Sequence, residues 1–270
     1  MRSLIHELRK HIYIYYLFVK NSLMSQMEYR ANFIGNFSME GGYFLAKLSY
    51  IAVIYRSGVK INGLSPDELL FFIGTFIFMT SSYAGLFMLN NFTLRGKIRD
   101  GDLDILITRP VSLQFLVTLR QADLVLFFTD AIGGAVIVVI AWVRLAIPIT
   151  LYTLGGYVLF LALSTVVAYC LFLLPQILSF WFVNTSAIAE ITDSFWDFNN
   201  MPMDIYNRYI QQIGVFILPI FVITNFPPMF VLGRMPTSYL AWAFLLPVVL
   251  LAFVRLLWSR GLRQYASASS

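Results

Sequence analysis

Residues 151–174 read LYTLGGYVLFLALSTVVAYCLFLL and contain no charged side chain. A helix needs about 20 mostly apolar residues to cross the ~30 Å hydrocarbon core of a bilayer. Outward from this stretch, the same criterion finds six apolar segments along the chain. We therefore predict an all-α, polytopic membrane protein with six transmembrane helices. They lie at Ala31–Tyr55, Glu68–Phe92, Asp123–Val143, Leu151–Phe182, Gln212–Met229 and Tyr239–Trp258.

The composition of the 270-residue chain agrees with this class. Hydrophobic residues make up 59% of the chain and charged residues 12%. Soluble domains have about 45–50% apolar and about 25% charged residues, so this chain has too few charges to cover a soluble surface. A single cysteine, Cys170, excludes an intramolecular disulfide. These counts exclude disulfide scaffolds and disfavour a soluble enzyme.

Motifs for catalysis and metal binding are missing from the sequence. No G-x-x-x-x-G-K-[ST] phosphate loop occurs, because residues 96–98 read GKI and Asn91 stands where the first glycine belongs. The two histidines, His6 and His11, lie near the N-terminus and, with one cysteine, cannot build a closed metal site. We expect no catalytic residue, no cofactor or metal bound by this chain, and no nucleic-acid partner.

The distribution of Lys and Arg predicts the orientation, because these residues are enriched in cytosolic loops. With the N-terminus inside, four of the 19 basic residues lie outside, Lys47 lies within a span, and the remaining 14 are cytosolic. Both termini are then cytosolic, including a short tail at 261–270. The outer residues are Arg56, Lys60, Arg144 and Arg234, and the cytosolic set includes Arg208.

Residues 1–30 are helical in pattern but too charged to span. Their apolar residues recur at three-four spacing, with charged residues elsewhere on the helical wheel. This pattern favours an amphipathic helix in the headgroup layer, where each Lys or Arg gains about 1 kcal/mol from anionic lipid. The alternative is a leader that only orients the first span. The apolar stripe consists of Leu4, Ile5, Leu8, His11, Ile12 and Tyr15.

The predicted cytosolic loop at about 93–120 contains RGKIRDGDLDILITRPVS at residues 95–112. Asp102 follows a turn signal and is a candidate helix cap, and Pro110 disfavours helical geometry at Arg109. Between them, a short helix would present apolar side chains that a partner normally covers. The alternative is a loop folded back on the bilayer. The apolar residues are Leu103, Ile105, Leu106 and Ile107.

This loop resembles that of the ABC-2 type permeases, six-span subunits of ATP-binding-cassette exporters with a separate ATPase. The resemblance rests on GDLDILITRPV at 101–111, EITDSFWDF at 190–198 and Met201-Pro, and it covers essentially the whole chain, 31–260 being the transmembrane domain. It implies that residues 102–110 form a coupling helix seated in the ATPase. The coupling residues would be Gly101, Asp102, Leu103, Asp104, Ile105, Leu106, Arg109 and Pro110.

The resemblance also implies partners and a location. ATPase subunits would bind ATP and magnesium, and a second permease subunit, the same chain or a related one, would complete the transporter. Membrane lipid is the surrounding partner, and short loops with a separate ATPase suit a multi-pass protein of the bacterial plasma membrane. The expected cargo is an amphiphile such as a drug, an antimicrobial compound or a lipid.

Polar residues inside the predicted spans are candidates for a substrate path, because ionisable side chains at membrane depth usually face a bundle or a water-filled cavity. The alternative is a set of interhelical bonds. Asp123 favours this structural alternative, because it lies near the interface. A rival function is an ion- or proton-coupled transporter using Glu40, Lys47 and Asp130; another is a non-transporting assembly protein. The path candidates are Asn36, Glu40, Tyr43 and Lys47, with Tyr50 on the same helical face, and Asp130.

Three further features predict details of the spans. Small residues such as Gly85 in the second span permit close helix approach. Pro175 is expected to kink the long fourth span, or its last turns protrude into the cytosol. The stretch 225–229, NFPPM, is expected to end the fifth span early, and the resemblance to ABC-2 permeases implies a short re-entrant or outer helix there. The acidic and aromatic segment before that span would be a second cytosolic contact, through Glu190, Asp193, Trp196, Asp197 and Asp204; the alternative is an ordinary solvated loop.

Overall fold

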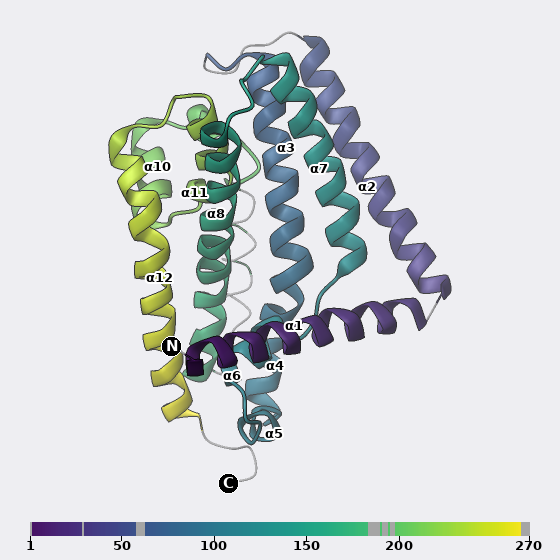
Figure 1. Ribbon diagram of the computed structural model, residues 1–270, viewed down its shortest axis with the longest axis vertical. Coiled ribbons are helices and arrows are strands. Elements are labelled where there is room, and N and C mark those ends of the chain that lie inside the picture. The colour runs from purple at the N-terminus through teal and green to yellow at the C-terminus, as the bar shows by residue number, and fades with distance from the viewer. Residues whose placement is uncertain are drawn as a thin grey trace.

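The computed structural model describes residues 2–28, 30–57, 63–182, 190, 194 and 198–265. These residues are helical, with no β-strand among them. Long helices stand side by side in a tall bundle, and α1 runs across it (Figure 1). The main elements are α1 (Arg2–Glu28), α2 (Arg30–Ser57), α3 (Pro66–Tyr83), α4 (Leu89–Arg99), α5 (Leu103–Ile107), α6 (Leu113–Leu119), α7 (Leu124–Arg144), α8 (Leu151–Ile177), α10 (Arg208–Gln212), α11 (Phe221–Val231) and α12 (Thr237–Gln264).

The bundle has two ends, which are named here after Gly101 and Ser65. The Gly101 end carries α5 and is the predicted cytosolic side, and the Ser65 end carries the first turn of α3. A π-helical turn, η1 (Ala84–Met88), joins α3 to α4. These three elements form one continuous helix of 34 residues, Pro66–Arg99, which runs from the Ser65 end to the Gly101 end.

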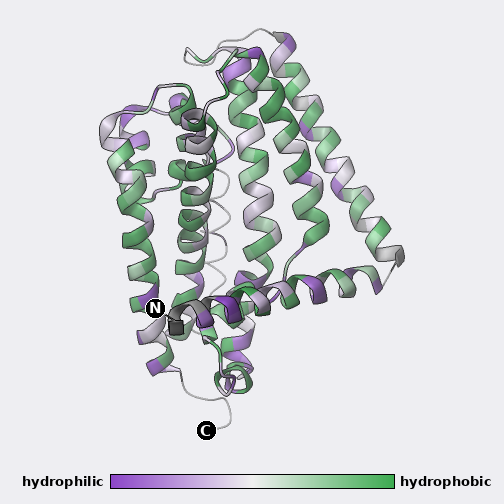
Figure 2. Cartoon of the chain, viewed as in Figure 1, coloured by the Kyte–Doolittle hydropathy of each residue, from purple (hydrophilic) through white to green (hydrophobic). Residues whose placement is uncertain are grey.

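Four helical stretches of the described residues are long and apolar enough to cross a membrane. This finding confirms a polytopic helical membrane protein. The α2 helix runs beside α3 and α7 over a similar length (Figure 1), but it is less apolar, with purple and white segments among the green ones in Figure 2. The four stretches are Pro66–Arg99, Leu124–Arg144, Leu151–Phe180 and Thr237–Gln264.

The segment predicted as the fifth span, Gln212–Met229, is not a straight helix. The helical stretch Arg208–Ile217 and α11 are bent by 105° at the break between them. The backbone of Leu218 has φ −115° and ψ 80°, outside the helical region, because the following Pro219 disfavours helical geometry at this position. The expected stop at residues 225–229 is also wrong, because Pro227 and Pro228 lie inside α11.

The first arm of this bent pair starts at the Ser65 end, and the second arm finishes there. The pair is therefore a re-entrant hairpin. Arg208 at the start of one arm lies close enough to Tyr239 to influence it electrostatically. Arg234, just after α11, forms an ion pair of 2.5 Å with Glu68 in the first turn of α3. Arg208 therefore lies at the end opposite to α5, whereas the prediction placed both on the cytosolic side; most Lys and Arg residues lie near the Gly101 end.

The acidic segment before the hairpin is predicted to make a cytosolic contact, on the same side as α5. One of its five residues, Asp204, does not lie on that side. Asp204 lines a small cavity of about 80 Å³ together with Glu68 and Arg234, at the opposite end. Burial raises the pKa of Asp204, an effect that nearby Arg234 partly offsets. Glu190 is an exposed helical residue. The other residues of this prediction, Asp193, Trp196 and Asp197, lie outside the described residues.

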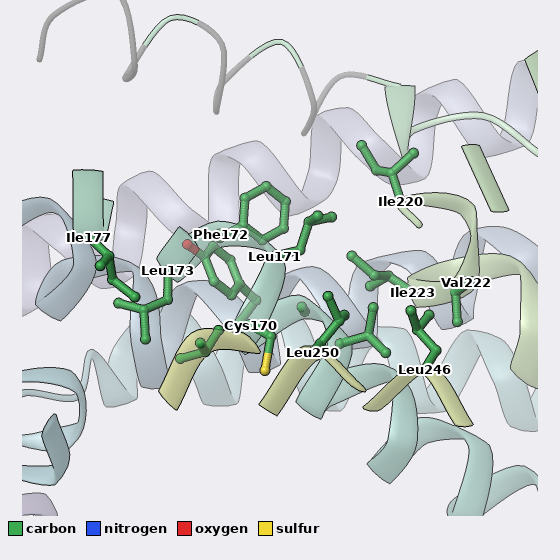
Figure 3. Packing of buried hydrophobic residues seen from close by; sticks show 14 of the residues in the cluster. Cys170, Leu171, Phe172, Leu173, Ile177, Ile220, Val222, Ile223, Leu246 and Leu250 are labelled. Carbon is green, nitrogen blue, oxygen red and sulfur yellow. The ribbon is translucent and has the colours of Figure 1, made fainter. Parts of the chain in front are cut away.

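The largest core lies among α8, α11 and α12, with aliphatic and aromatic side chains from all three helices in contact (Figure 3). Cys170 is buried within it as a free thiol. Pro175 lies inside α8, which continues to Ile177 and then into a 3₁₀ turn ending at Phe180. The Phe180 ring packs edge-on against Trp258, with 5.4 Å between the ring centroids. This contact joins α8 to α12 near the Gly101 end.

The closest helix crossing is that of α3 and α7, where glycines face the opposite backbone. A Cβ atom at Gly134 would lie 2.7 Å from the amide nitrogen of Phe78, and one at Gly74 would lie 2.9 Å from that of Val138. A Cβ at Gly85 would lie 2.6 Å from the Cβ of Phe127. The predicted close approach at Gly85 is confirmed, and small residues let the two backbones meet.

We predict opposite effects from adding one methyl group at two helical glycines. Gly134→Ala should lower the melting temperature, because the new methyl clashes with the α3 backbone, and overpacking typically costs about 1–3 kcal/mol. The control is Gly155→Ala in α8, where the nearest atom to an added Cβ is 3.7 Å away. It should be neutral or stabilising, because alanine favours helix by about 1 kcal/mol. Thermal unfolding followed by size-exclusion fluorescence compares them; equal melting temperatures would contradict the packing described.

Candidate functional site

The first candidate site is α5 at the Gly101 end, and a sharp turn positions it. Gly101 has a φ of 81°, a left-handed conformation that favours glycine. The amide of Asp104 then donates to the Gly101 carbonyl at 3.1 Å. Beside the turn, Arg99 and Asp100 form an exposed ion pair of 2.8 Å, and this hydrogen bond lowers the pKa of Asp100. The turn lets α5 fold back after the long helix Pro66–Arg99.

The expected cap by Asp102 is wrong. Its backbone has φ −63° and ψ −17°, which is already helical, and its side chain makes no capping bond. A capping residue normally has extended backbone geometry, so that its side chain can reach the free amides of the first turn. The Asp102 side chain is exposed instead.

The apolar side chains of α5 divide into a buried pair and an exposed pair, of which Ile107 lies four positions after Leu103 and is the last residue of the helix. Leu103 is 0% exposed and Leu106 is 8% exposed, and both belong to the main core. Ile105 and Ile107 are 64% and 51% exposed. Three-residue spacing places positions 103 and 106 on the same side of a helix, and position 105 faces away. This corrects the expectation that all four side chains face a partner: two anchor the helix, and two remain available for contact.

The α1 helix lies across this region and contacts it at several points. The Lys10 ammonium donates to the Pro110 carbonyl at 2.9 Å. The ring of His11 meets the ring of Phe115 in α6 edge-on, with 5.0 Å between centroids. Near the far end of α1, Gln26 donates to the Ala122 carbonyl at 3.1 Å. The side chain of Arg109 is exposed.

Tyr265, just after α12, also reaches α5. Burial raises the pKa of Tyr265, and the neighbouring Asp104 carboxylate raises it further. The C-terminal end of the last long helix therefore lies beside α5. Three parts of the chain that are distant in sequence thus surround this short helix.

The second candidate site is the polar face of α2. The Lys47 ammonium lies 2.5 Å from the Asp130 carboxylate of α7. The Asp130 residue is 3% exposed, and its second oxygen has no hydrogen-bond partner among the described residues. Glu40 lies near enough to both groups to interact with them electrostatically. The structure therefore brings together three of the predicted path residues, with two carboxylates and one ammonium.

The packing face of α2 is rotated slightly from the predicted one. Phe44 packs over Gly133 of α7, and Ile51 is buried at 8% exposure. Together with Glu40 and Lys47, these residues are spaced by four, three and four positions, which defines one helical face. Tyr43 is 60% exposed and does not face α7. The side chains of Asn36 and Tyr50 are outside the described set.

Asp123 makes bonds that are typical of a structural residue. Its carboxylate caps α7 by accepting from the Leu126 amide at 3.1 Å, and its own amide donates to the Gly85 carbonyl at 2.7 Å. Gln26 of α1 lies at 3.5 Å from the same carboxylate. This arrangement agrees with the structural alternative expected for Asp123.

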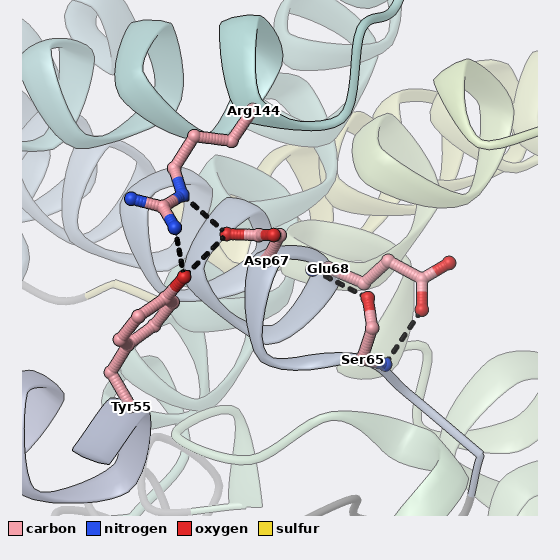
Figure 4. A network of polar contacts seen from close by, with 5 residues as sticks. All are labelled: Tyr55, Ser65, Asp67, Glu68 and Arg144. Carbon is pink, nitrogen blue, oxygen red and sulfur yellow. Dashed lines mark hydrogen bonds and ion pairs between the residues drawn. The ribbon is translucent and has the colours of Figure 1, made fainter. Parts of the chain in front are cut away.

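A polar cluster at the Ser65 end is a site that sequence reasoning missed (Figure 4). The Arg144 guanidinium, at the end of α7, lies 2.8 Å from Asp67 and stacks 4.9 Å from the centre of the Tyr55 ring. The Tyr55 hydroxyl donates to the same Asp67 carboxylate at 3.2 Å. Ser65 and Glu68 cap α3 reciprocally. The S-x-x-E spacing at 65–68 was the available signal, because it is typical of a capping box.

The fold and these sites define a class: a helical membrane protein with a short helix at one end that exposes two apolar side chains. Among the described residues, no three His, Cys, Asp or Glu side chains gather to hold a metal ion. A family model described as "ABC-2 family transporter protein" matches residues 42–269. The chain belongs to the ABC-2 family of transporter proteins. Neither the curated proteins nor the solved structures compared with it give a match.

We predict that the Lys47–Asp130 pair stabilises the bundle. Lys47→Met should lower the melting temperature, because it leaves the buried Asp130 carboxylate without its counter-charge; the Lys47 side chain is 35% exposed, so the loss should be smaller than the about 3–5 kcal/mol of a fully buried pair. The double variant Lys47→Met/Asp130→Leu should recover most of this loss, because no buried charge is left unpaired.

Transport by the double variant separates the two readings of this pair. Restored stability together with restored transport indicates a purely structural bond. Restored stability without transport indicates a substrate path. A stable Lys47→Met variant would contradict the burial of the pair, and Ser49→Ala on the exposed side of α2 is the control.

Proposed function

We propose that this chain is the permease subunit of an ABC exporter and that α5 couples it to a separate ATPase subunit. The observation that carries the proposal is the division of α5: Ile105 and Ile107 are exposed, whereas Leu103 and Leu106 are buried in the bundle core. A partner that grips the exposed pair would therefore act on an element fixed to the transmembrane helices. Exposed apolar side chains beside polar turns are typical of an interaction surface.

The long helix Pro66–Arg99 supports a mechanical role for α5. Leu94, near its end, is fully buried in the same core as Leu103 and Leu106. The helix continues from there to the Ser65 end, where it carries Asp67 and Glu68. ATP-driven closure of two ATPase subunits would displace both α5 helices of a permease pair. The bundle would then rock between two access states.

The proposal keeps an even number of crossings, because both ends of the chain would be on one side of the membrane. The α2 helix and the four long apolar stretches supply five of the six. Phe180 lies near the Gly101 end, with Trp258 and Gly261, whereas Asp204 lies at the Ser65 end. These two described residues therefore lie at opposite ends of the bundle, and the re-entrant hairpin is not counted as a crossing. Both termini would be cytosolic.

We further propose that α1 lies in the headgroup layer as an elbow helix. It is 27 residues long and runs across the bundle at the Gly101 end (Figure 1). Its aromatic residues Tyr13 and Tyr16 are exposed at 63% and 58%. Tyrosine is enriched at membrane interfaces, which supports this placement. In a bacterium, the membrane would be the plasma membrane.

The cargo proposed is an amphiphile, and ATP and magnesium would be bound by the ATPase subunits. The polar face with Glu40, Lys47 and Asp130 would line the path between two permease subunits. The same residues support the second candidate, an ion- or proton-coupled carrier, because one oxygen of the buried Asp130 carboxylate has no hydrogen-bond partner among the described residues. Transport in vesicles with and without the ATPase distinguishes them: an ATP requirement supports the exporter, and transport driven by a proton gradient alone supports the carrier.

We predict that charge placed on the exposed face of α5 breaks the complex. The double variant Ile105→Asp/Ile107→Asp should reduce ATPase co-purification at least tenfold, because two apolar side chains would no longer be buried, and each contributes about 1.5–3 kcal/mol when fully buried. Melting temperature should change little, since both side chains are exposed. Co-purification from membranes with a tagged permease measures the effect.

Matched controls test whether the position matters. Leu151→Asp carries a similar change at the Ser65 end, where Leu151 is 92% exposed, and should keep the ATPase bound. Leu103→Asp should instead destabilise the permease itself, because this residue is fully buried. Unchanged binding of the ATPase by the double variant would refute α5 as the docking element.

A further inference from the structure

A groove of about 370 Å³ opens near the Gly101 end between α6, α8 and α12, with η1 at its base. Its lining is almost entirely apolar. Phe87 and Tyr169 form one aromatic wall, with 5.3 Å between their ring centroids. Phe115 of α6 forms another part of the lining and is held from behind by the α1 rings of His11 and Phe18. The remaining apolar lining includes Leu119, Val166 and Leu251.

Polar groups gather along one wall of the groove. The Tyr169 hydroxyl lies 3.2 Å from the Gln114 amide nitrogen and 3.2 Å from the Thr118 hydroxyl. The Arg255 guanidinium of α12 donates one N–H to the Gln114 oxygen at 3.3 Å. No carboxylate pairs with Arg255 among the residues that the structure describes. The exposed guanidinium therefore keeps further donors and a full positive charge beside an apolar groove.

The depth of Arg255 matches a lipid headgroup. It lies about 18 residues, or ~27 Å, along α12 from Thr237, given a rise of 1.5 Å per residue. The hydrocarbon core of a bilayer is ~30 Å thick. If Thr237 lies near one interface, the guanidinium is near the other, and the groove extends from it into the apolar layer. At this depth the medium around the bundle is lipid.

We infer that this groove is a binding site for one anionic membrane lipid of the leaflet at the Gly101 end. An acyl chain occupies the apolar groove between α8 and α12, and the lipid phosphate contacts the free donors of Arg255. Charge complementarity selects an anionic headgroup over a zwitterionic one. The bidentate geometry of guanidinium suits a phosphate.

The inference goes beyond the proposed function, because it needs no ATPase and no transport. It also links lipid to the docking region. One wall of the groove is α6, which follows α5 in the chain, and Lys10 of α1 bonds to the Pro110 carbonyl between them. A lipid in the groove would therefore hold α6, α8 and α12 together next to α5.

The test is native mass spectrometry of the purified full chain with added phosphatidylglycerol or phosphatidylcholine. The wild type should retain phosphatidylglycerol preferentially. Arg255→Gln should reduce this preference about fivefold, because one basic residue near a membrane contributes about 1 kcal/mol. The control is Arg260→Gln, an exposed arginine five positions along the same helix and on a different face, which should leave the preference unchanged.

A second pair of variants tests whether the acyl chain occupies the groove. Leu251→Trp should fill the groove and reduce retention of both lipids, whereas Phe253→Trp, a similarly exposed position outside the groove, should not. Inorganic phosphate at millimolar concentration should not displace the lipid, because most of the contact is apolar. Displacement by phosphate, or equal behaviour of Arg255→Gln and Arg260→Gln, would overturn the inference.

Photo-crosslinking of the unaltered chain keeps the test decisive if a variant does not fold. Phosphatidylglycerol with a diazirine in its acyl chain should label residues 165–169 of α8 and Leu251 of α12 above other lipid-facing positions. Even labelling of all lipid-facing helices would show only a general lipid layer and would overturn the inference.

Discussion

The close packing of α3 against α7 is the contact on which the rest of the structure depends. Gly74 and Gly134 remove the side chains that would otherwise separate the two backbones. Since apolar surface gains little from leaving lipid, helices in a membrane associate through such close contacts and through polar bonds. The α3 helix then contacts α2, α8 and α11 as well, and continues without interruption to Arg99, next to α5.

The two ends of the bundle differ in chemistry. At the Ser65 end, charged side chains form ion pairs: Asp67 with Arg144, and Glu68 with Arg234. These pairs tie the start of α3 to the end of α7 and to the segment that follows the re-entrant hairpin. At the Gly101 end, the apolar side chains of Ile105 and Ile107 face outward. This contrast supports the proposal that a partner binds at the Gly101 end.

Some positions could be predicted from local pattern because their geometry is local. Capping, turns and helix breaks depend on a few neighbouring residues, as at Gly101, whose positive φ follows a clear turn signal. Other positions could not. The partner of Lys47 is 83 residues away, and helical spacing alone predicts a face of α2 that is rotated slightly from the one that packs on α7. The fifth apolar segment was misread because a re-entrant hairpin and a transmembrane helix bury similar apolar side chains. The 105° bend between Arg208–Ile217 and α11 distinguishes the hairpin from a straight transmembrane helix.

By itself, the sequence determined the class of protein, the long apolar helices and the ABC-2 family, because composition, span length and a short loop motif suffice for these. The tertiary structure decided which side of each helix is used. Leu103 and Ile105 are equally apolar, yet one is buried and the other exposed. The difference arises because burial depends on which neighbouring helix lies beside a residue, and that packing joins segments far apart in the chain.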